Sequence, residues 1–142
     1  FTSKSVKVVA CASFFAFDPN FPGGAYVAAG NIDGDPSNGD ELVVGAGAGG
    51  GPQVRVFRIK GPGDNVGVLA GFFPYASGFK GGVRVAVADE GGDAKDEIIT
   101  ATGAGGGPHV KIFDIDLAQI GPGFYAYNDS FNGGVFVAAG RA

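Results

Sequence analysis

The chain has 142 residues, with 28 glycines, one cysteine, 45% hydrophobic residues and a formal net charge of −4 at pH 7. The hydrophobic fraction is large enough for a folded core, which excludes a disordered linker, and no apolar run approaches the roughly 20 residues of a membrane-spanning helix. Glycine does not recur at every third position, so the chain is not collagen. The acidic balance argues against nucleic acid or an anionic membrane surface as the main partner.

The chain opens on two short apolar runs, residues 6–10 and 14–17, which predict β-strands. Both runs recur later as the third and fourth strands of a longer unit, so residues 1–20 are expected to supply the outer two strands of a partial unit. Because the chain contains no methionine, we expect Phe1 to follow a removed secretory signal or to mark excision from a larger protein.

Residues 21–75 contain four short runs of β-branched or aromatic residues bounded by Gly, Pro, Asp or Asn, which is typical of strands. The expected strands lie around residues 24–29, 40–45, 54–57 and 72–75. The first run has small side chains on both faces of the strand, which suits a strand packed closely against its equivalents around an axis. The third run alternates apolar with basic residues. Basic residues on solvated strand faces, rather than in one basic groove, are therefore expected at Lys7, Arg55, Arg84 and Lys111.

Residues 79–127 repeat this unit. The run Gly24-Ala-Tyr-Val-Ala-Ala29 is matched by Gly82-Val-Arg-Val-Ala-Val87 at an offset of 58 residues. The run Gly49-Gly-Gly-Pro-Gln-Val-Arg-Val-Phe57 recurs as Gly105-Gly-Gly-Pro-His-Val-Lys-Ile-Phe113 at an offset of 56 residues. Self-similarity at this spacing is the signature of a repeat architecture.

Residues 128–142 carry the start of a third copy, Gly134-Val-Phe-Val-Ala-Ala139, and are expected to form one innermost strand at residues 135–139. Four antiparallel strands in each repeat predict an all-β fold of β-propeller blades. The whole chain, residues 1–142, is then one array in an incomplete ring, with two full blades and a partial blade at each end. Propellers contain about 4 to 8 blades, so closure needs a neighbouring chain or the rest of a longer protein. A β-sandwich is the alternative fold, although sandwiches do not repeat their loops so faithfully.

The loop between the first two strands of the first full unit carries side-chain oxygens at alternate positions and a glycine for a sharp turn. Calcium takes about 6 to 8 oxygen ligands, and alternate residues of a tight loop point inward. We therefore predict a calcium site whose ligands are Asn31, Asp33, Asp35, the carbonyl of Ser37, and Asp40 or Glu41. The alternative is an acidic turn held by side chain-to-backbone hydrogen bonds without a metal.

The equivalent loop of the second unit keeps the acids at its first, fifth and last positions, while Gly91 replaces the middle one. The missing acid predicts a weaker calcium site. Its predicted residues are Asp89, Asp93, Lys95 and Glu97. In the third copy Arg141 stands where the first ligand should be, so no calcium site is expected there.

The run Val27-Ala-Ala-Gly-Asn-Ile-Asp-Gly-Asp35, followed by Glu41-Leu-Val-Val-Gly-Ala-Gly47, resembles the FG-GAP or VCBS-type repeat. Such repeats form the calcium-binding propeller of integrin α subunits and of many secreted bacterial proteins, and the resemblance covers essentially the whole chain in partial copies. A two-residue insertion before Glu41 and the glycine at Gly91 depart from the family pattern. The resemblance implies extracellular adhesion or recognition, and it does not imply an enzyme. It places calcium ligands at Asp33, Asp35, Glu41, Asp89, Asp93 and Glu97.

Other patterns in the chain argue against catalysis. The glycine-rich stretch at residues 45–50 runs into Pro52 and another strand, whereas a dinucleotide-binding motif opens a helix. His109 is the only histidine, and Gln53 holds its place in the other full unit, which favours a hydrogen-bonding loop residue over a catalytic base. The paired carboxylates all lie in the predicted calcium loops, so a glycosidase pair has no support.

The sequence favours a non-enzymatic, extracellular or cell-surface, calcium-stabilised repeat protein for adhesion or structural self-assembly. We expect the strand at residues 135–139 to pair with residues 6–10 and 14–17 of a neighbouring chain, giving a ring or a filament, unless the rest of a longer protein completes the blades. An extracellular glycan or protein is expected as a further binding partner. Two alternatives stay open: a fragment of a propeller enzyme that degrades polysaccharides, and a lectin-like module with aromatic side chains at Phe17, Tyr75 and Tyr127.

Overall fold

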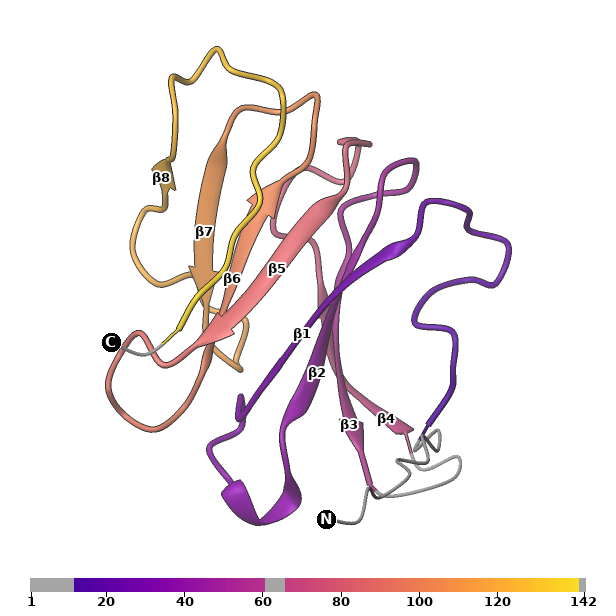
Figure 1. The fold of residues 1–142 in the computed structure, drawn as a ribbon, viewed down its shortest axis with the longest axis vertical. Coiled ribbons are helices and arrows are strands. Elements are labelled where there is room, and N and C mark those ends of the chain that lie inside the picture. The colour runs from indigo at the N-terminus through magenta and orange to yellow at the C-terminus, as the bar shows by residue number, and fades with distance from the viewer. Residues whose placement is uncertain (1–11, 61–65, 141–142) are drawn as a thin grey trace, which may run out of the picture.

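The computed structural model describes residues 12–60 and 66–140, and this part of the chain is all-β, as predicted (Figure 1). The first sheet consists of β1 (Ala25–Gly30), β2 (Glu41–Ala46), β3 (Val54–Ile59) and β4 (Val66–Phe72). The second sheet consists of β5 (Val83–Ala88), β6 (Glu97–Thr102), β7 (His109–Phe113) and β8 (Phe124–Tyr125). Within these ranges the one helical element is a 3-10 turn, η1 (Pro36–Asn38), in the loop between β1 and β2.

Each sheet is an antiparallel meander in which every strand pairs with the next strand along the chain. The register is the same in both sheets. Val27 lies opposite Val44 in the first sheet, and their repeat equivalents, Val85 and Thr100, face each other in the second. The repeats found in the sequence are therefore equivalent units in three dimensions.

The main hydrophobic core lies between the two sheets, where β5 packs across β1 and β2 (Figure 1). Both sheets contribute mostly β-branched side chains, which fit a pleated surface. The buried members are Ile32, Val43, Val54, Val56, Val83, Val85, Ile98 and Phe113. On the other face of the second sheet, the C-terminal segment forms a second core with the residues Ala86, Ile99, Ala101, Val110 and Val135.

The fourth strands agree with the prediction only in part. The sequence predicts them at residues 72–75 and 124–127; β4 lies upstream of its range and ends at Phe72, whereas β8 lies within its range but spans only two residues. Pro74 has no N–H to donate to a ladder, so pairing stops before it. Gly67 and Gly71 interrupt the apolar pattern of β4, which is why the sequence alone does not reveal this strand.

The terminal segments are less regular than predicted. Residues 14–17 and 135–139 form no strand, because within the described ranges neither segment has a neighbouring strand of its own unit to pair with. Val135 is nevertheless attached to the second sheet, since its N–H donates to the carbonyl of Thr102 at 2.9 Å. The strand predicted at residues 6–10 lies outside the described residues.

Neither sheet closes into a ring within the described part of the chain, and the propeller arrangement stays a prediction. In the described residues no helix is long and apolar enough to cross a membrane.

Candidate metal loops and the interface between the sheets

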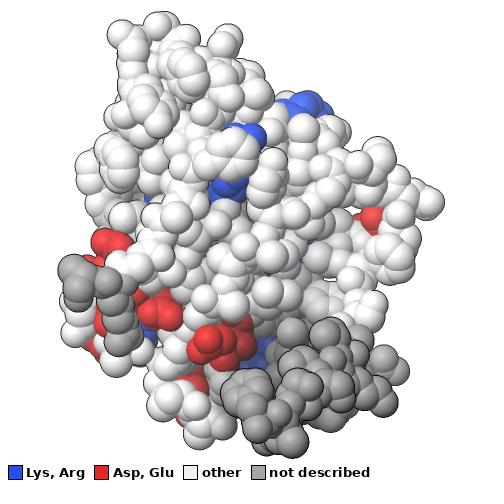
Figure 2. Space-filling view, viewed as in Figure 1, with Lys and Arg blue, Asp and Glu red and all other residues white. Residues whose placement is uncertain are grey.

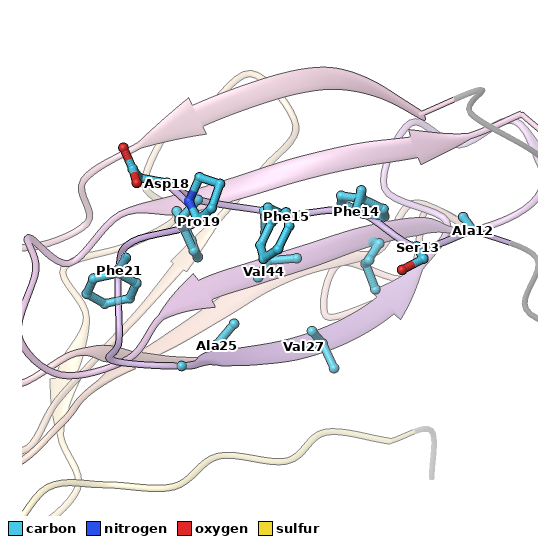
Figure 3. Close-up of a pocket in the computed structure, with 14 residues that line it drawn as sticks. Ala12, Ser13, Phe14, Phe15, Asp18, Pro19, Phe21, Ala25, Val27 and Val44 are labelled. Carbon is cyan, nitrogen blue, oxygen red and sulfur yellow. The ribbon is translucent and has the colours of Figure 1, made fainter.

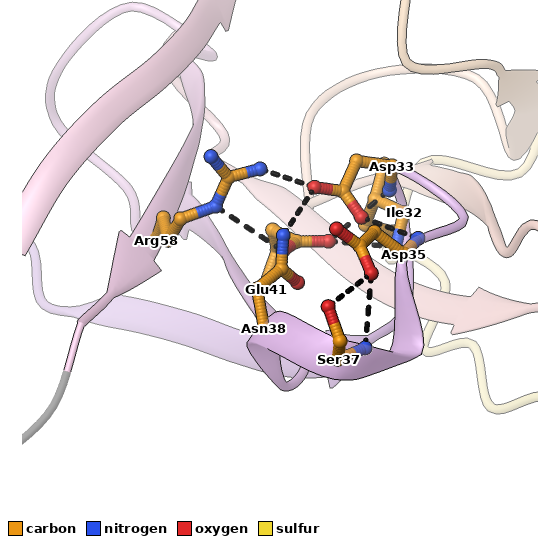
Figure 4. Close-up of polar contacts among 7 residues, drawn as sticks. All are labelled: Ile32, Asp33, Asp35, Ser37, Asn38, Glu41 and Arg58. Carbon is orange, nitrogen blue, oxygen red and sulfur yellow. Dashed lines mark hydrogen bonds and ion pairs between the residues drawn. The ribbon is translucent and has the colours of Figure 1, made fainter.

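Glu41, the last acid of the first loop, is fully buried at the start of β2 and anchors the loop that precedes it. Its Oε2 accepts hydrogen bonds from the backbone N–H groups of Ile32 at 2.9 Å and Asp33 at 3.1 Å (Figure 4). Its Oε1 accepts no hydrogen bond and lies 3.7 Å from Nε of Arg58, a residue of β3. A buried carboxylate thus fixes the loop backbone and faces a guanidinium.

Asp33 also faces Arg58. Its Oδ2 forms an ion pair with the guanidinium and accepts a hydrogen bond from Nδ2 of Asn38 at 3.0 Å, while its Oδ1 accepts from the backbone N–H of Asp35 at 2.8 Å. The hydrogen bond from Asp35, followed by those from the other partners, holds the pKa of Asp33 below its ordinary value of 3.8. The carboxylate is therefore ionised and already surrounded by donors.

Of the remaining predicted ligands of the first loop, Asp35 and Ser37 are hydrogen-bonded to each other, whereas Asp40 stands apart. Asp35 caps η1, because its Oδ1 accepts from the backbone N–H of Ser37 at 3.0 Å and from its hydroxyl at 2.6 Å. The hydroxyl of Ser37 is the main reason why the pKa of Asp35 is lowered. Asp40 is exposed and forms no part of this network. Asn38 and Arg58 join the network although the sequence analysis did not include them.

The second loop repeats the anchor. Glu97, buried at the start of β6, accepts at Oε2 from the backbone N–H groups of Glu90 at 2.6 Å and Gly91 at 3.2 Å. Asp89 accepts three backbone hydrogen bonds from the residues that follow it, at distances of 2.6 to 3.2 Å. Asp93 accepts from the backbone N–H of Lys95 at 3.0 Å. The predicted residues are thus linked mainly through the backbone.

A carboxylate outside both predicted ligand sets joins the two loops. Oδ2 of Asp96 accepts from the backbone N–H of Asn31 at 2.8 Å, and the N–H of Asp96 donates to the carbonyl of Asn31 at 2.9 Å. The side chain of Lys95 lies beside Gly34 of the first loop, because a Cβ placed on Gly34 would come within 2.8 Å of its Cγ. Asn31 and Lys95 therefore connect the loops. Figure 2 shows the acidic side chains gathered at this end of the molecule.

The fit of these loops to calcium is mixed. The donors are all oxygens, as calcium requires, and two buried ones, Oδ1 of Asn31 and Oε1 of Glu41, accept no hydrogen bond. In the part of the chain that the structure describes, however, no three His, Cys, Asp or Glu side chains are grouped so that they could hold a metal ion. In the first loop Arg58 already supplies positive charge. Calcium binding stays a prediction, and the geometry matches the hydrogen-bonded acidic turn.

The contact between the two sheets has a second copy at the N-terminal segment. Between the sheets, the rings of Phe72 and Phe113 have centroids 4.9 Å apart at an interplanar angle of 61°. Their repeat equivalents, Phe14 and Phe57, have centroids 5.0 Å apart at 58°. Residues 14–17 therefore contact the first sheet in the way that the end of β4 contacts the second.

Basic side chains take part in both copies of this contact. Nζ of Lys111 donates to the carbonyl of Pro74 at 2.9 Å, and Nη1 of the equivalent Arg55 donates to the carbonyl of Ala16 at 2.8 Å. Lys111 lies over the ring of Tyr75 and Arg55 over the ring of Phe17, with centroid distances of 5.1 and 5.6 Å. These basic residues are half-buried, so the prediction of solvated faces is wrong for them. Packing of long side chains over aromatic rings explains the difference.

Tyr75 is also an interface residue. Its hydroxyl donates to the backbone carbonyl of His109 at 2.7 Å, and burial raises the pKa of Tyr75 to about 12. The sequence predicts His109 as a loop residue, but it is the first residue of β7, and its ring stacks on Tyr125 with centroids 4.8 Å apart. Burial, followed by the charge of Lys111, lowers the pKa of His109, so its ring is neutral at pH 7.

The start of β5 and the C-terminal segment repeat their contacts as well. A Cβ on Gly82 would lie 2.9 Å from the backbone nitrogen of Ala48, and one on the equivalent Gly134 would lie 2.8 Å from that of Ala104. Both glycines have positive φ, so glycine is needed for conformation as well as for space. Cζ of Arg84 lies 5.3 Å from the ring centroid of Tyr26 and 4.1 Å from that of Phe136. These three residues hold equivalent positions in the three copies of the repeat, and their side chains stack on one another.

Comparisons with protein-family models, with curated proteins and with solved structures found no match to this chain. The resemblance to FG-GAP or VCBS-type repeats accordingly stays a prediction made from the sequence.

Proposed function

We propose that this chain is a non-enzymatic array of β-propeller-type repeats that acts in extracellular adhesion or structural assembly. The observation that carries the proposal is the recurrence of one inter-unit contact along the chain. Residues 14–17 meet the first sheet as the end of β4 meets the second sheet, and residues 134–139 meet the second sheet as the start of β5 meets the first.

This recurrence favours consecutive blades over a sandwich. A two-sheet sandwich has one buried interface, whereas here both faces of the second sheet are covered, by β1 and β2 on one side and by Val135 on the other. In a propeller each blade packs between two neighbours in this way. The basic residues serve the same contact, since Arg55 and Lys111 each reach back to the unit before.

Calcium is the proposed stabiliser of the loops at one end of the array. In the first loop Asp33, Asp35 and Glu41 would hold it, and in the second Asp89, Asp93 and Glu97 would. When bound, calcium would neutralise the carboxylates that the fold concentrates at this end. The buried oxygens of Glu41 and Asn31 that accept no hydrogen bond support the first site, while the ion pairs with Arg58 weigh against tight binding there.

A calcium titration by isothermal calorimetry on chelator-treated protein, combined with melting temperatures in calcium and in EGTA, tests the stabiliser. We expect binding heat and a higher melting temperature in calcium. Glu97→Gln should reduce both effects, and Asp129→Asn, which changes an exposed acid outside the loops, should leave them unchanged. The absence of heat and of any melting shift at millimolar calcium would remove calcium from the proposal.

The lectin-like alternative has weaker support. Tyr75, one of its three aromatic residues, lies in the contact between the sheets, and Phe17 lies in the equivalent contact. Tyr127 is exposed, and its ring packs edge-on against Phe131. Glycan-array binding that survives EGTA and is lost in Tyr127→Ala would favour this alternative.

A further inference from the structure

We infer that the chain associates head to tail with a second copy of itself, the outward face of residues 134–140 of one copy covering the outward face of β1 of the other. The inference rests on the proposed function, because it extends the contact between consecutive units to a contact between chains. Both halves of that contact are exposed on this chain.

The first exposed half is one face of β1. Tyr26 and Ala28 point toward the second sheet and are half-buried, whereas Ala25, Val27 and Ala29 point away and are exposed. Val27 is 64% exposed, but its equivalent on β5, Val85, is 7% exposed because the first sheet covers it. An apolar strand face that is buried in one unit is thus open in the other.

The second exposed half is one face of the C-terminal segment. Val135 is buried against the second sheet and Val137 packs beside it. Phe136 and Ala138 lie on the outward side, where Phe136 is 74% exposed although Arg84 lies over its ring. By repeat position, Phe136 and Ala138 correspond to Tyr26 and Ala28, the side chains with which β1 meets β5. The outward face of residues 134–140 is therefore the kind of surface that packs on an innermost strand.

A hollow beside β1 gives the segment a place to dock. It has a volume of about 440 Å³ and lies between residues 12–19 and the first sheet (Figure 3). Val27 and Val44 line its floor and Phe15, itself 74% exposed, lines its side (Figure 3). Residues 14–17 thus cover the outer part of the first sheet and leave the innermost part open.

The second copy is favoured over an unrelated partner because the complementary surface is already part of the molecule. β1, β5 and residues 134–140 occupy the same position in three successive units. One further step of the same kind places β1 of a second chain directly after residues 134–140 of the first chain. Such a contact is heterologous and leads to a ring or a filament. It also covers two apolar faces that a lone chain leaves in water.

Sedimentation velocity of the full chain over a wide concentration range, in the presence of calcium, tests the inference. We expect the average molecular mass of the sedimenting species to rise with protein concentration. Val27→Asp and Phe136→Asp should each weaken the association by at least about tenfold, since each places a charge in an apolar contact. Val68→Asp is the matched control, because Val68 on β4 is 61% exposed and lies outside the proposed contact. Circular dichroism confirms that each variant is folded, and Ala25→Glu replaces Val27→Asp if that variant is not.

Mixing the two interface variants distinguishes a head-to-tail contact from a symmetric one. Val27→Asp keeps an intact tail and Phe136→Asp keeps an intact head, so their mixture should form dimers that grow no further. A wild-type chain that stays monomeric, or a mixture that does not restore dimers, overturns the inference. A chain that binds calcium but stays monomeric contradicts this inference alone, whereas a chain that associates without binding calcium contradicts the calcium proposal alone.

Discussion

The two acidic loops share one anchor and differ in how their charge is balanced. Glu41 and Glu97 are both buried and both accept two backbone N–H groups from the turn before them. In the first loop Arg58 pairs with Glu41 and Asp33. The equivalent position in the second unit is Asp114, whose carboxylate accepts a hydrogen bond from the backbone N–H of Ala118 instead.

The difference shows that the backbone of a repeat and its electrostatics are specified separately. The buried glutamate keeps the loop shape in both units, because an unsatisfied buried N–H is costly wherever it occurs. Compensation of the negative charge depends on the side chain at the end of the third strand. Calcium is therefore expected to matter more for the second loop than for the first.

Removal of the buried glutamate is expected to give the largest effect. Glu41→Ala leaves two N–H groups without an acceptor and takes one partner from Arg58, so the free energy of unfolding should fall by about 3 kcal/mol. Glu97→Ala removes the same anchor without affecting a guanidinium and should cost about 2 kcal/mol. Urea unfolding measures both, with the exposed Glu90→Ala as the control. Equal losses would show that Arg58 does not distinguish the loops.

Replacement of Arg58 sharpens the comparison. Arg58→Met leaves Oε1 of Glu41 buried without a nearby cation, and the free energy of unfolding should fall by about 2 kcal/mol, a value reduced because Arg58 is partly exposed. The melting temperature of this variant should also rise more in calcium than that of the wild type. Arg58→Lys keeps the charge and serves as the control. An unchanged response to calcium in Arg58→Met would contradict the role of Arg58 as a built-in cation.

The link between the loops should contribute less. Asp96→Ala removes the acceptor of the Asn31 N–H and is expected to cost about 1.5 kcal/mol in urea unfolding. Asp40→Ala changes the equivalent residue of the first unit, which is exposed, and should have almost no effect. If the two variants lost the same stability, the bond to Asn31 would have no energetic role.

A small pH effect should separate the loops as well. The pKa of Asp33 is lowered in the folded chain, so the stability that its ionised form contributes is fully present above its ordinary value of 3.8 and is lost as the pH falls toward and below the folded value. Asp33→Asn should therefore flatten the decrease in melting temperature between about pH 5 and pH 3. Asp93→Asn in the second loop is the matched comparison. A decrease that Asp33→Asn leaves unchanged would assign the acid sensitivity to other carboxylates.

Much of the fold could be predicted from the sequence because the repeats carry strong strand patterns. The runs that contain Val27, Val43 and Val54 are β-branched, are bounded by turn residues and recur in register, so β1 to β3 and β5 to β7 follow from them. The outer strand of the first unit did not follow, because Gly67 and Gly71 remove the apolar alternation from β4. The ring cannot be derived from two units, since closure depends on contacts beyond them.

The candidate site was predictable in its residues more than in its arrangement. Spacing of acids identifies Asp33, Asp35 and Glu41, but it does not reveal that Arg58, 17 positions beyond Glu41, turns back to face two of them. A basic residue at the end of the third strand was a signal that the sequence analysis assigned to no role. The hydrogen bond between Asp96 and Asn31 could not be predicted either, because it depends on how one unit packs on the next.

The equivalent glycines that precede β5 and the C-terminal segment, Gly82 and Gly134, have a consequence for how a repeat protein of this kind can lengthen. Each unit presents the same two packing surfaces to its neighbours, so duplication of the coding sequence for one unit would add a unit whose contacts already exist. No new surface has to arise for the array to lengthen. A large side chain at either glycine would instead interrupt the series at that joint and leave the units beyond it without support.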